Sequence, residues 1–353
     1  MSVAEARVSG ELPSPLLPGA APQSGPLRDR RGRVARKLRL SLTDRCHFSC
    51  VFCMPERGKV QWIPREEILD FDEIVRIVRL LALDGVEKVR LTGGEPLLRP
   101  GVADLLRRLK GLPGLREIDM TTNGERLPEL ARELREAGLD GITVSLHSLQ
   151  RERFAQLAGL DVLPRVLEGI ESALRVGFPV KINAVAIRGY NEEEIPALVE
   201  YARERSLPLR FIEFMPLDGR GNWDQGSVLT GAEILATLRS SHPLTPLARE
   251  SGDTARRYRL EGSDAEVGLI TPVSEPFCDD CDRIRLTADG KLLTCLFDTH
   301  LHDVRGPLRA GASDEELRAL LRRSYEEKPP GIQYIRDLQH GFQKPRPMHA
   351  IGG

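Results

Sequence analysis

The sequence has little charge imbalance, few aromatic residues and no long apolar run. Lys and Arg number 51 against 52 Asp and Glu, which gives a formal net charge of −1. This balance excludes a protein that binds nucleic acid or a membrane surface through bulk positive charge, so an anionic ligand needs a local cluster of cations. No segment approaches the roughly 18 apolar residues of a membrane span, and the first residues lack the apolar stretch of a signal peptide. We therefore expect a cytoplasmic protein with no membrane partner.

Cysteine is also scarce, with six in 353 residues. In a reducing compartment, clustered cysteines bind metal or carry out redox chemistry more often than they form disulfides. The six form two triplets with none left over, namely Cys46, Cys50 and Cys53 near the start and Cys278, Cys281 and Cys295 near the end.

Strand-like runs alternate with amphipathic segments from about residue 38 onward. The runs are Leu38–Leu42, Lys88–Leu91, Glu117–Thr121, Gly141–Leu146, Val180–Ala186 and Leu209–Glu213. The helical segments between them are Arg65–Asp84, Gly101–Lys110, Leu127–Ala137, Leu163–Val176 and Glu192–Glu204. This alternation predicts an α/β fold with parallel strands and right-handed crossovers, and six strands suit an open or partial barrel.

The pattern changes near residue 245. Capping boxes predict helices that start at Thr230, with Glu233, and at Ser313, with Glu316. Residues 255–297 read as antiparallel β structure with a hairpin at Asp289-Gly290. We expect three parts: a flexible tail over residues 1–26, a partial barrel over residues 27–245, and a C-terminal α+β domain over residues 246–353.

The first cysteine triplet lies in the loop after the first predicted strand. Three thiolates without a fourth ligand suit a 4Fe-4S cluster that keeps one iron open. The alternative is a zinc site or three unrelated thiols, but structural zinc sites have a fourth ligand and His47 is poorly placed for ligation. Polar, glycine-bearing motifs follow other strands, including Thr92-Gly93-Gly94-Glu95-Pro96 and Thr122-Asn123-Gly124. Since barrel enzymes build active sites at this end of their strands, these motifs predict one shared site.

The three-cysteine loop followed by Gly-Gly-Glu-Pro resembles the radical S-adenosylmethionine superfamily. The resemblance implies that the open iron binds S-adenosylmethionine, whose reductive cleavage gives a 5′-deoxyadenosyl radical. Gly93 and Gly94 then allow close approach of the bound amino acid, and Glu95 is expected to face its ammonium group.

The second triplet also offers three thiolates, and Arg283-Ile284-Arg285 follows Cys281 closely. A zinc ribbon is the plainer interpretation of a CxxC pair, but the segment has no fourth cysteine. Alternation on a strand places Arg283 and Arg285 on one face, where two guanidinium groups suit a phosphate. A solvated surface pair is the alternative.

The set of motifs is similar to that of the GTP 3′,8-cyclase family of molybdenum cofactor biosynthesis, from about residue 29 to Gly352-Gly353. That resemblance implies an incomplete (β/α)6 TIM-like barrel, a C-terminal domain with an auxiliary 4Fe-4S cluster, and a lyase that converts GTP to (8S)-3′,8-cyclo-7,8-dihydroguanosine 5′-triphosphate. Two 4Fe-4S clusters and S-adenosylmethionine are the implied cofactors. The implied cofactor contacts are Phe52, Gly94, Glu95, Ser145 and Met215. The implied GTP contacts are Arg39, Arg90, Thr121, Lys181, Arg283, Ile284 and Arg285, and activity is assigned to Arg283, Arg285, Gly352 and Gly353.

Two positions depart from the family pattern, since His47 follows the first cysteine where Asn is usual and His147 stands where Asp is typical. The resemblance also implies a reductant such as flavodoxin or ferredoxin and hand-over of product to cyclic pyranopterin monophosphate synthase. A homodimer is left open. Two alternatives stand beside this reading: a radical enzyme that modifies peptides or proteins, and a zinc-binding interaction module without turnover.

Overall fold

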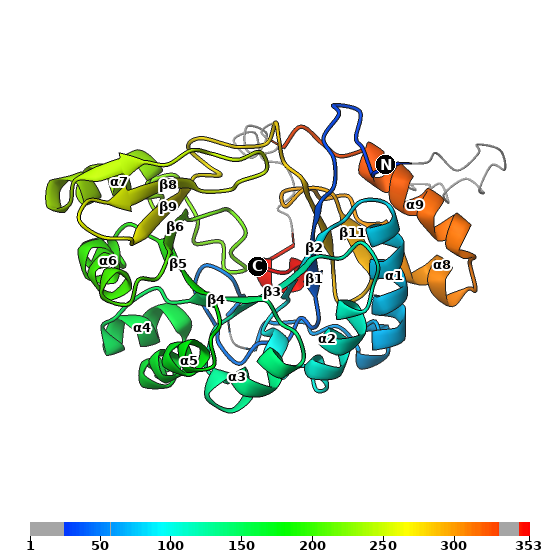
Figure 1. Ribbon diagram of the computed structural model, residues 1–353, viewed down its shortest axis with the longest axis horizontal. Helices are drawn as coiled ribbons and strands as arrows, with labels where there is room; N and C mark the ends of the chain where they lie inside the picture. Colours follow the sequence, from blue (N-terminus) through cyan, green and yellow to red (C-terminus); the bar gives the residue numbers. More distant parts are fainter. Residues whose placement is uncertain (1–24, 57, 332–345) are drawn as a thin grey trace, which may run out of the picture.

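The computed structural model describes residues 25–56, 58–331 and 346–353, and within them one curved sheet organises the molecule (Figure 1). Its twelve strands run in the order β12-β11-β10-β1-β2-β3-β4-β5-β6-β9-β8-β7. The centre consists of six parallel strands, β1 (Lys37–Ser41), β2 (Lys88–Thr92), β3 (Glu117–Thr122), β4 (Gly141–Ser145), β5 (Val180–Ala186) and β6 (Leu209–Glu213). The six strands predicted from the sequence are thus confirmed.

Strands from the C-terminal third extend both edges of this centre. β10 (Arg283–Leu286) pairs in parallel with β1, and β9 (Glu266–Ile270) pairs in parallel with β6. Their other neighbours are antiparallel: β11 (Lys291–Leu293) and then β12 (His302–Asp303) on one side, β8 (Arg256–Leu260) and then β7 (Leu244–Pro246) on the other. The antiparallel structure predicted over residues 255–297 is confirmed for β8 with β9 and for β10 with β11. The parallel pairing of β9 with β6 and of β10 with β1 was not predicted, because a hairpin signal reports only local pairing. A division near residue 245 stays a prediction, and the sheet runs across it.

Helices lie along the outer side of the curved sheet (Figure 1). They are α1 (Phe71–Leu83), α2 (Val102–Lys110), α3 (Leu127–Glu136), α4 (Arg151–Ala158), α5 (Leu163–Arg175), α6 (Ile195–Glu204), α7 (Gly231–Ser241), α8 (Arg305–Arg309) and α9 (Asp314–Glu326), with short 3-10 turns η1 (Arg65–Glu67), η2 (Pro96–Leu98) and η3 (Glu192–Glu194). No helix in the described part of the chain is both long enough and apolar enough to cross a lipid bilayer.

The helix ends follow from local capping chemistry. The predicted capping boxes at Thr230 and Ser313 are both present. The helix expected from Arg65 starts later, at Phe71, because Asp70 and Glu73 form a further capping box there. α4 was not predicted, since it is only eight residues long and lies between two longer elements.

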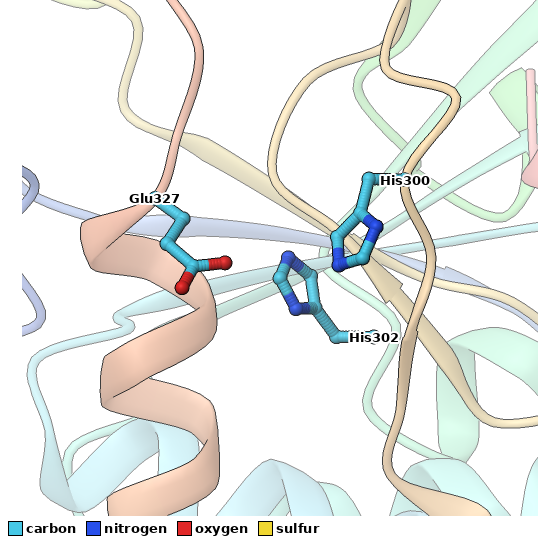
Figure 2. Close-up of side chains that lie close together, drawn as sticks. All are labelled: His300, His302 and Glu327. Carbon is cyan, nitrogen blue, oxygen red and sulfur yellow. The ribbon is translucent and has the colours of Figure 1, made fainter. Parts of the chain in front are cut away.

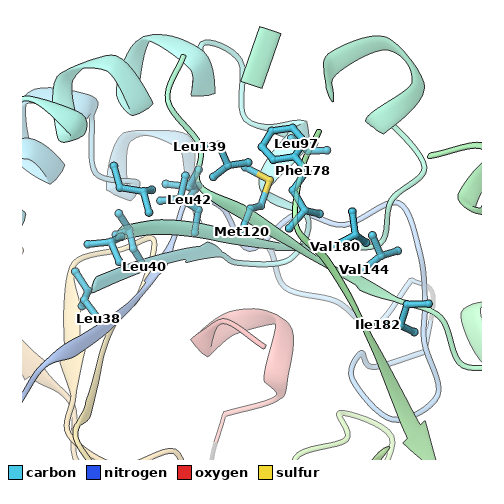
Figure 3. Packing of buried hydrophobic residues seen from close by; sticks show 14 of the residues in the cluster. Leu38, Leu40, Leu42, Leu97, Met120, Leu139, Val144, Phe178, Val180 and Ile182 are labelled. Carbon is cyan, nitrogen blue, oxygen red and sulfur yellow. The ribbon is translucent and has the colours of Figure 1, made fainter. Parts of the chain in front are cut away.

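The two faces of the central sheet have different environments (Figure 3). Leu40, Met120, Val144 and Ile182 point toward the helices and are fully buried in the main core. The last helix, α11 (Met348–Ile351), lies on the opposite, concave face. Because side chains alternate along a strand, the residues between these apolar positions face the concave side, where the polar site forms.

Candidate active site

A row of cations crosses the concave face of the sheet. Register places Arg39 on β1 opposite both Arg285 on β10 and Arg90 on β2. Farther along the sheet, Lys181 on β5 lies opposite Thr143 on β4, which in turn lies opposite Thr121 on β3. The four cations and both threonines line one cavity of ≈450 Å³.

Most of these cations lack a carboxylate partner. Arg90 is the exception, because it pairs with Asp119 at 2.5 Å and donates to Thr143 at 2.9 Å. In the described part of the chain, no ion pair joins a carboxylate to Arg39, Lys181, Arg283, Arg285 or the further cavity residue Arg210.

The unpaired cations repel one another. Burial lowers the pKa of Arg39, and the neighbouring Arg285 and Arg90 lower it further. Burial, assisted by Arg283, lowers the pKa of Arg285 to about 10. Desolvated like charges are unfavourable until an anion neutralises them, so this part of the cavity is built for a multiply charged anion.

The first cysteine triplet lies at one end of the same cavity, in the loop after β1. The N–H groups of Cys53 and Met54 both donate to the carbonyl of Cys50 at 3.0 Å, which winds the loop into a tight turn. Burial raises the pKa of all three thiols, and the neighbouring sulfurs act in the same direction. Three such thiols favour binding a cation that stabilises their thiolate form.

Two outside elements hold this cysteine loop. The N–H of Ser49 donates to the carbonyl of Ala158, at the end of α4, at 2.8 Å. From the loop after β6, Arg220 donates to the Ser49 carbonyl at 2.7 Å and to the Met54 carbonyl at 3.3 Å. The loop therefore has a fixed shape before any ligand binds.

The glycine pair after β2 packs against the cysteine loop. The Gly94 N–H donates to the Thr43 carbonyl at 2.7 Å, and a Cβ on Gly94 would lie 2.3 Å from the Arg45 carbonyl oxygen. A Cβ on Gly93 would lie 2.3 Å from the Thr43 carbonyl oxygen. The close approach that these glycines permit is therefore one between two loops of the chain itself, although both residues also line the cavity.

Glu95 is fully buried and its carboxylate already has several donors. Oε1 accepts from the Thr122 hydroxyl at 2.7 Å and from the Leu97 N–H at 3.0 Å, and Oε2 accepts from the Asn123 N–H at 2.8 Å. Burial raises the pKa of Glu95 to about 7, against the effect of these hydrogen bonds. The structure thus gives Glu95 a bracing role for the loop after β3, in addition to its place in the cavity wall.

The remaining predicted contacts to S-adenosylmethionine also line the cavity, namely Phe52, Ser145 and Met215. The Phe52 ring meets the imidazole of His147 edge to face, with centroids 4.6 Å apart. His147 Nδ1 accepts a hydrogen bond from the Val185 N–H at 3.0 Å, so its proton lies on Nε2. Burial lowers the pKa of His147 to about 4, which keeps this imidazole neutral beside the Phe52 ring.

The second cysteine triplet lines the other end of the cavity. Burial alone raises the pKa of the Cys281 thiol, but Arg283 and Lys328 outweigh it and lower the pKa to about 6. The Lys328 ammonium also donates to the Arg283 carbonyl at 2.7 Å, and Arg33 donates to the Cys278 carbonyl at 2.9 Å. The chain thus surrounds this triplet with cations.

The spacing of the sulfurs bears on the choice between zinc and a cluster. Zn–S bonds of about 2.3 Å bring the sulfurs on one zinc ion to about 3.8 Å from one another. Within the described residues, which include all six cysteines, the one group of three metal-ligand side chains gathered within 4.8 Å is His300, His302 and Glu327. Neither cysteine triplet is that tight, whereas a cluster binds its cysteines on separate iron atoms.

The C-terminal tail lies between the two triplets. Arg285 donates to the carbonyl of Gly352, and the Thr92 hydroxyl donates to that of Gly353 at 2.6 Å. A hydrogen bond from the backbone of His349 reaches the Cys53 thiol. A small second core of Leu217, Leu293, Phe297 and Ile351 packs α11 against the segment that carries Cys295. Gly353 itself lines the cavity.

One predicted contact faces elsewhere and several residues were missed. Ile284 is fully buried in the main core and is not part of the cavity wall, because its neighbours Arg283 and Arg285 take the concave face. Arg210 and Asn183 line the cavity but were not predicted. The alternation of Leu209-Arg210-Phe211-Ile212 was the signal for Arg210, since a cation between two buried residues of a central strand must face the site.

Family comparisons agree with this geometry. Residues 40–202 match the model of the radical SAM superfamily, and residues 207–334 match the Molybdenum Cofactor Synthesis C model. The crystal structure of Streptococcus suis SuiB bound to S-adenosylmethionine aligns with 88% of this chain and 68% of that chain, with a TM-score of 0.58 and 16% identity. The fold and the three-cysteine loop define a radical S-adenosylmethionine protein.

Relatives with higher sequence identity show which family of radical S-adenosylmethionine proteins the chain belongs to. The GTP 3′,8-cyclase of Pelotomaculum thermopropionicum is 42% identical over 93% of this chain and 100% of its own length. That of Streptomyces coelicolor is 43% identical over 93% of this chain and 96% of its own length. The chain belongs to the GTP 3′,8-cyclase family.

Proposed function

We propose that the protein converts GTP to (8S)-3′,8-cyclo-7,8-dihydroguanosine 5′-triphosphate, the first step of molybdenum cofactor biosynthesis. The observation that carries this proposal is one cavity of ≈450 Å³ that joins both cysteine triplets and a row of cations without carboxylate partners. Four cations without an anionic partner, from Arg39, Lys181, Arg210 and Arg285, match the four charges of the triphosphate, and Arg283 lies beside them with Cys281 as its partner. This arrangement reconciles a near-neutral chain with a highly charged substrate.

The chain's own residues bind and orient the reactants. Cys46, Cys50 and Cys53 would hold a 4Fe-4S cluster, which with S-adenosylmethionine and an electron from a reductant would supply the radical chemistry that removes the C3′ hydrogen of GTP. Phe52 offers a ring for the adenine, and neutral His147 positions that ring. The cationic row fixes the triphosphate, so the ribose is held at the end of the cavity that faces the first triplet.

For the second triplet we propose a second 4Fe-4S cluster that faces the guanine. Two observations support it over zinc: the segment has no fourth cysteine, and Cys281 has a pKa of about 6 beside Arg283 and Lys328. The cations that stabilise a thiolate also stabilise the negative charge of a cluster. Cys278, Cys281 and Cys295 would hold this cluster and would supply no fourth thiolate, which would leave a position for the base.

Further aspects of the function stay predictions. Delivery of electrons by a flavodoxin or ferredoxin, hand-over of the product to cyclic pyranopterin monophosphate synthase, and dimerisation belong to the same proposal. The alternative is a radical enzyme that modifies peptides. The incubation with GTP described next distinguishes between the two functions.

The test is anaerobic incubation of the reconstituted protein with S-adenosylmethionine, a reductant and GTP carrying deuterium at C3′. Because the product is an isomer of GTP, it is separated by chromatography before mass analysis. We expect a new triphosphate and 5′-deoxyadenosine that contains the deuterium, both absent with Cys46→Ala. Deuterium-free 5′-deoxyadenosine without a new nucleotide would overturn the proposal.

A further inference from the structure

A second group of metal-ligand side chains, His300, His302 and Glu327, gathers outside the cavity wall (Figure 2). One ligand atom from each of His300, His302 and Glu327 lies within 4.8 Å of the other two. None of the three lines the cavity, and no function has been assigned to them above.

Two separate elements bring these residues together. His302 is the first residue of β12, where it lies opposite Leu292 of β11, and His300 precedes it by two positions in the loop that leads into β12. The two imidazole centroids are 4.5 Å apart at 84°. Glu327 follows directly after α9 and caps its C-terminal end. Figure 2 shows its carboxylate directed toward the imidazole pair.

The donor set has the chemistry of a transition-metal site. Two imidazole nitrogens and one carboxylate oxygen suit zinc and its neighbours, whereas calcium and magnesium prefer oxygen alone. Bonds of about 2.1 Å place ligand atoms about 3.4 Å apart, so atoms that lie within 4.8 Å of one another need to approach by at most about 1.4 Å on binding. His300 and Glu327 are exposed, which leaves their side chains room to do so.

We propose that His300, His302 and Glu327 bind one divalent transition-metal ion, with zinc as the fitting ion and water completing its coordination. The proposal does not depend on the catalysed reaction, because the three ligands lie outside the cavity and the ion has a structural role. The ion would join the segment after Cys295 to the C-terminal end of α9.

The proposed ion would add to the hydrogen bonds that already hold the segments next to the second cysteine triplet. The Asp298 N–H donates to the Cys295 carbonyl at 3.3 Å, and the His300 N–H donates to the Asp298 carboxylate at 2.9 Å. On the far side of the site, Lys328 follows Glu327 and donates to the Arg283 carbonyl at 2.7 Å. An ion between the histidines and Glu327 therefore links the two segments that flank Cys295.

The experiment is calorimetric titration of zinc chloride into anaerobic holoprotein with both cysteine triplets loaded and no polyhistidine tag. We expect one high-affinity equivalent and a rise in the thermal unfolding temperature. Loss of a residue that only hydrogen-bonds to a metal ligand lowers metal affinity by roughly 10- to 100-fold. His300→Ala and His302→Ala remove a ligand itself, so each should lower the zinc affinity by more than that. Glu327→Gln should weaken it as well.

The control variant is His242→Ala, which removes a histidine at the end of α7 and should leave zinc binding unchanged. Iron content is measured for every variant, so that zinc taken up by empty cysteine sites is recognised. Zinc binding that is equal in the parent and in the His300→Ala, His302→Ala double variant would overturn the proposal. So would the absence of a high-affinity equivalent in the parent.

Discussion

Arg285 donates a hydrogen bond from its guanidinium to the carbonyl oxygen of Gly352. A residue of the cationic row is thereby joined to the last turn of the chain. Gly353 is held beside it by Thr92, and His349 reaches Cys53. The tail is thus part of the wall between the two cysteine triplets, and it contacts both the cationic row and the first triplet.

Gly352 has a backbone conformation that only glycine adopts easily, with a φ of 80°. A Cβ at this position would lie 2.5 Å from Ser41 Oγ and 2.8 Å from Thr92 Cγ2. Gly352→Ala is therefore expected to displace the tail and abolish cyclisation, as is deletion of Gly352 and Gly353, while iron content and GTP binding remain. The control is Gly262→Ala, since Gly262 has a similar φ of 74° with nothing within 4 Å. Full turnover of Gly352→Ala would show that the tail is dispensable.

Arg210 is expected to bind substrate although it lies on β6, far along the sheet from Arg285. A charge-assisted hydrogen bond contributes about 1.5–3 kcal/mol, so Arg210→Ala should weaken GTP binding about 10- to 100-fold. Arg283→Ala and Arg285→Ala should weaken it to a similar degree. Equilibrium dialysis with GTP measures the change. Arg259→Ala, on the exposed side of β8, is the matched control, and an Arg210→Ala affinity equal to that of the control would contradict the assignment.

The two cysteine triplets are expected to bind clusters independently. Replacing Cys46, Cys50 and Cys53 by alanine should lower the iron content from about eight atoms to about four, because one 4Fe-4S cluster remains. Replacing Cys278, Cys281 and Cys295 should have the same effect on iron but leave reductive cleavage of S-adenosylmethionine detectable. Iron and acid-labile sulfide analysis under anaerobic conditions provides the readout. Parental iron content in either variant would refute the assignment.

Glu95 is expected to stabilise the loop after β3 through its hydrogen bonds. In Glu95→Gln an amide N–H₂ replaces one acceptor and opposes a donor from Thr122 or Asn123. An unsatisfied buried donor costs about 1–3 kcal/mol, so the free energy of unfolding should fall by that amount. Denaturant titration measures it, with Glu136→Gln at the exposed end of α3 as the control. If Glu95→Gln and Glu136→Gln had the same free energy of unfolding, Glu95 would not stabilise this loop.

His147 predicts a pH dependence of stability. Its pKa is about 4 in the folded protein because of burial, against 6.5 for an ordinary histidine. Above pH 6.5 both states are neutral and His147 contributes no slope. As the pH falls from 6.5 toward 4, the unfolded chain binds a proton that the folded chain does not, so stability decreases.

The matched variant is His147→Gln, whose side-chain carbonyl can accept from the Val185 N–H. Between about pH 7.5 and about pH 5.5 the parent should lose about 1 kcal/mol more stability than this variant. The measurement is the urea midpoint at both pH values. Equal losses in the two proteins would mean that His147 is protonated in the folded state.

The sequence predicted those features that depend on local pattern. Strand alternation identified β1 to β6. Alternation also predicted that Arg283 and Arg285 share a face, and both line the cavity, whereas Arg39 and Arg90 were proposed only through the family resemblance. The capping boxes at Thr230 and Ser313 were also recognisable, because they involve residues three apart.

Features that depend on distant contacts were not predictable in this way. The parallel pairing of β10 with β1 has no local signature, so the sequence indicated only the antiparallel pairing of β10 with β11. The role of Glu95 depends on Thr122 and Asn123, which reach it only through the fold. Ile284 shows the converse, since proximity in sequence to two site arginines did not bring its side chain into the cavity.

The pairing of β1 with β10 also constrains the order of events during synthesis. β1 and the first cysteine loop leave the ribosome early, but one edge of β1 has no partner until residues 283–286 have been made. An unpaired strand edge is prone to associate with other chains, and contacts between distant segments form slowly. The cavity wall that holds Arg39 and Arg285 side by side is therefore assembled late. Translation that stops before β10 leaves a nascent chain with an exposed edge, which makes it a substrate for chaperones or proteases rather than a partially active enzyme.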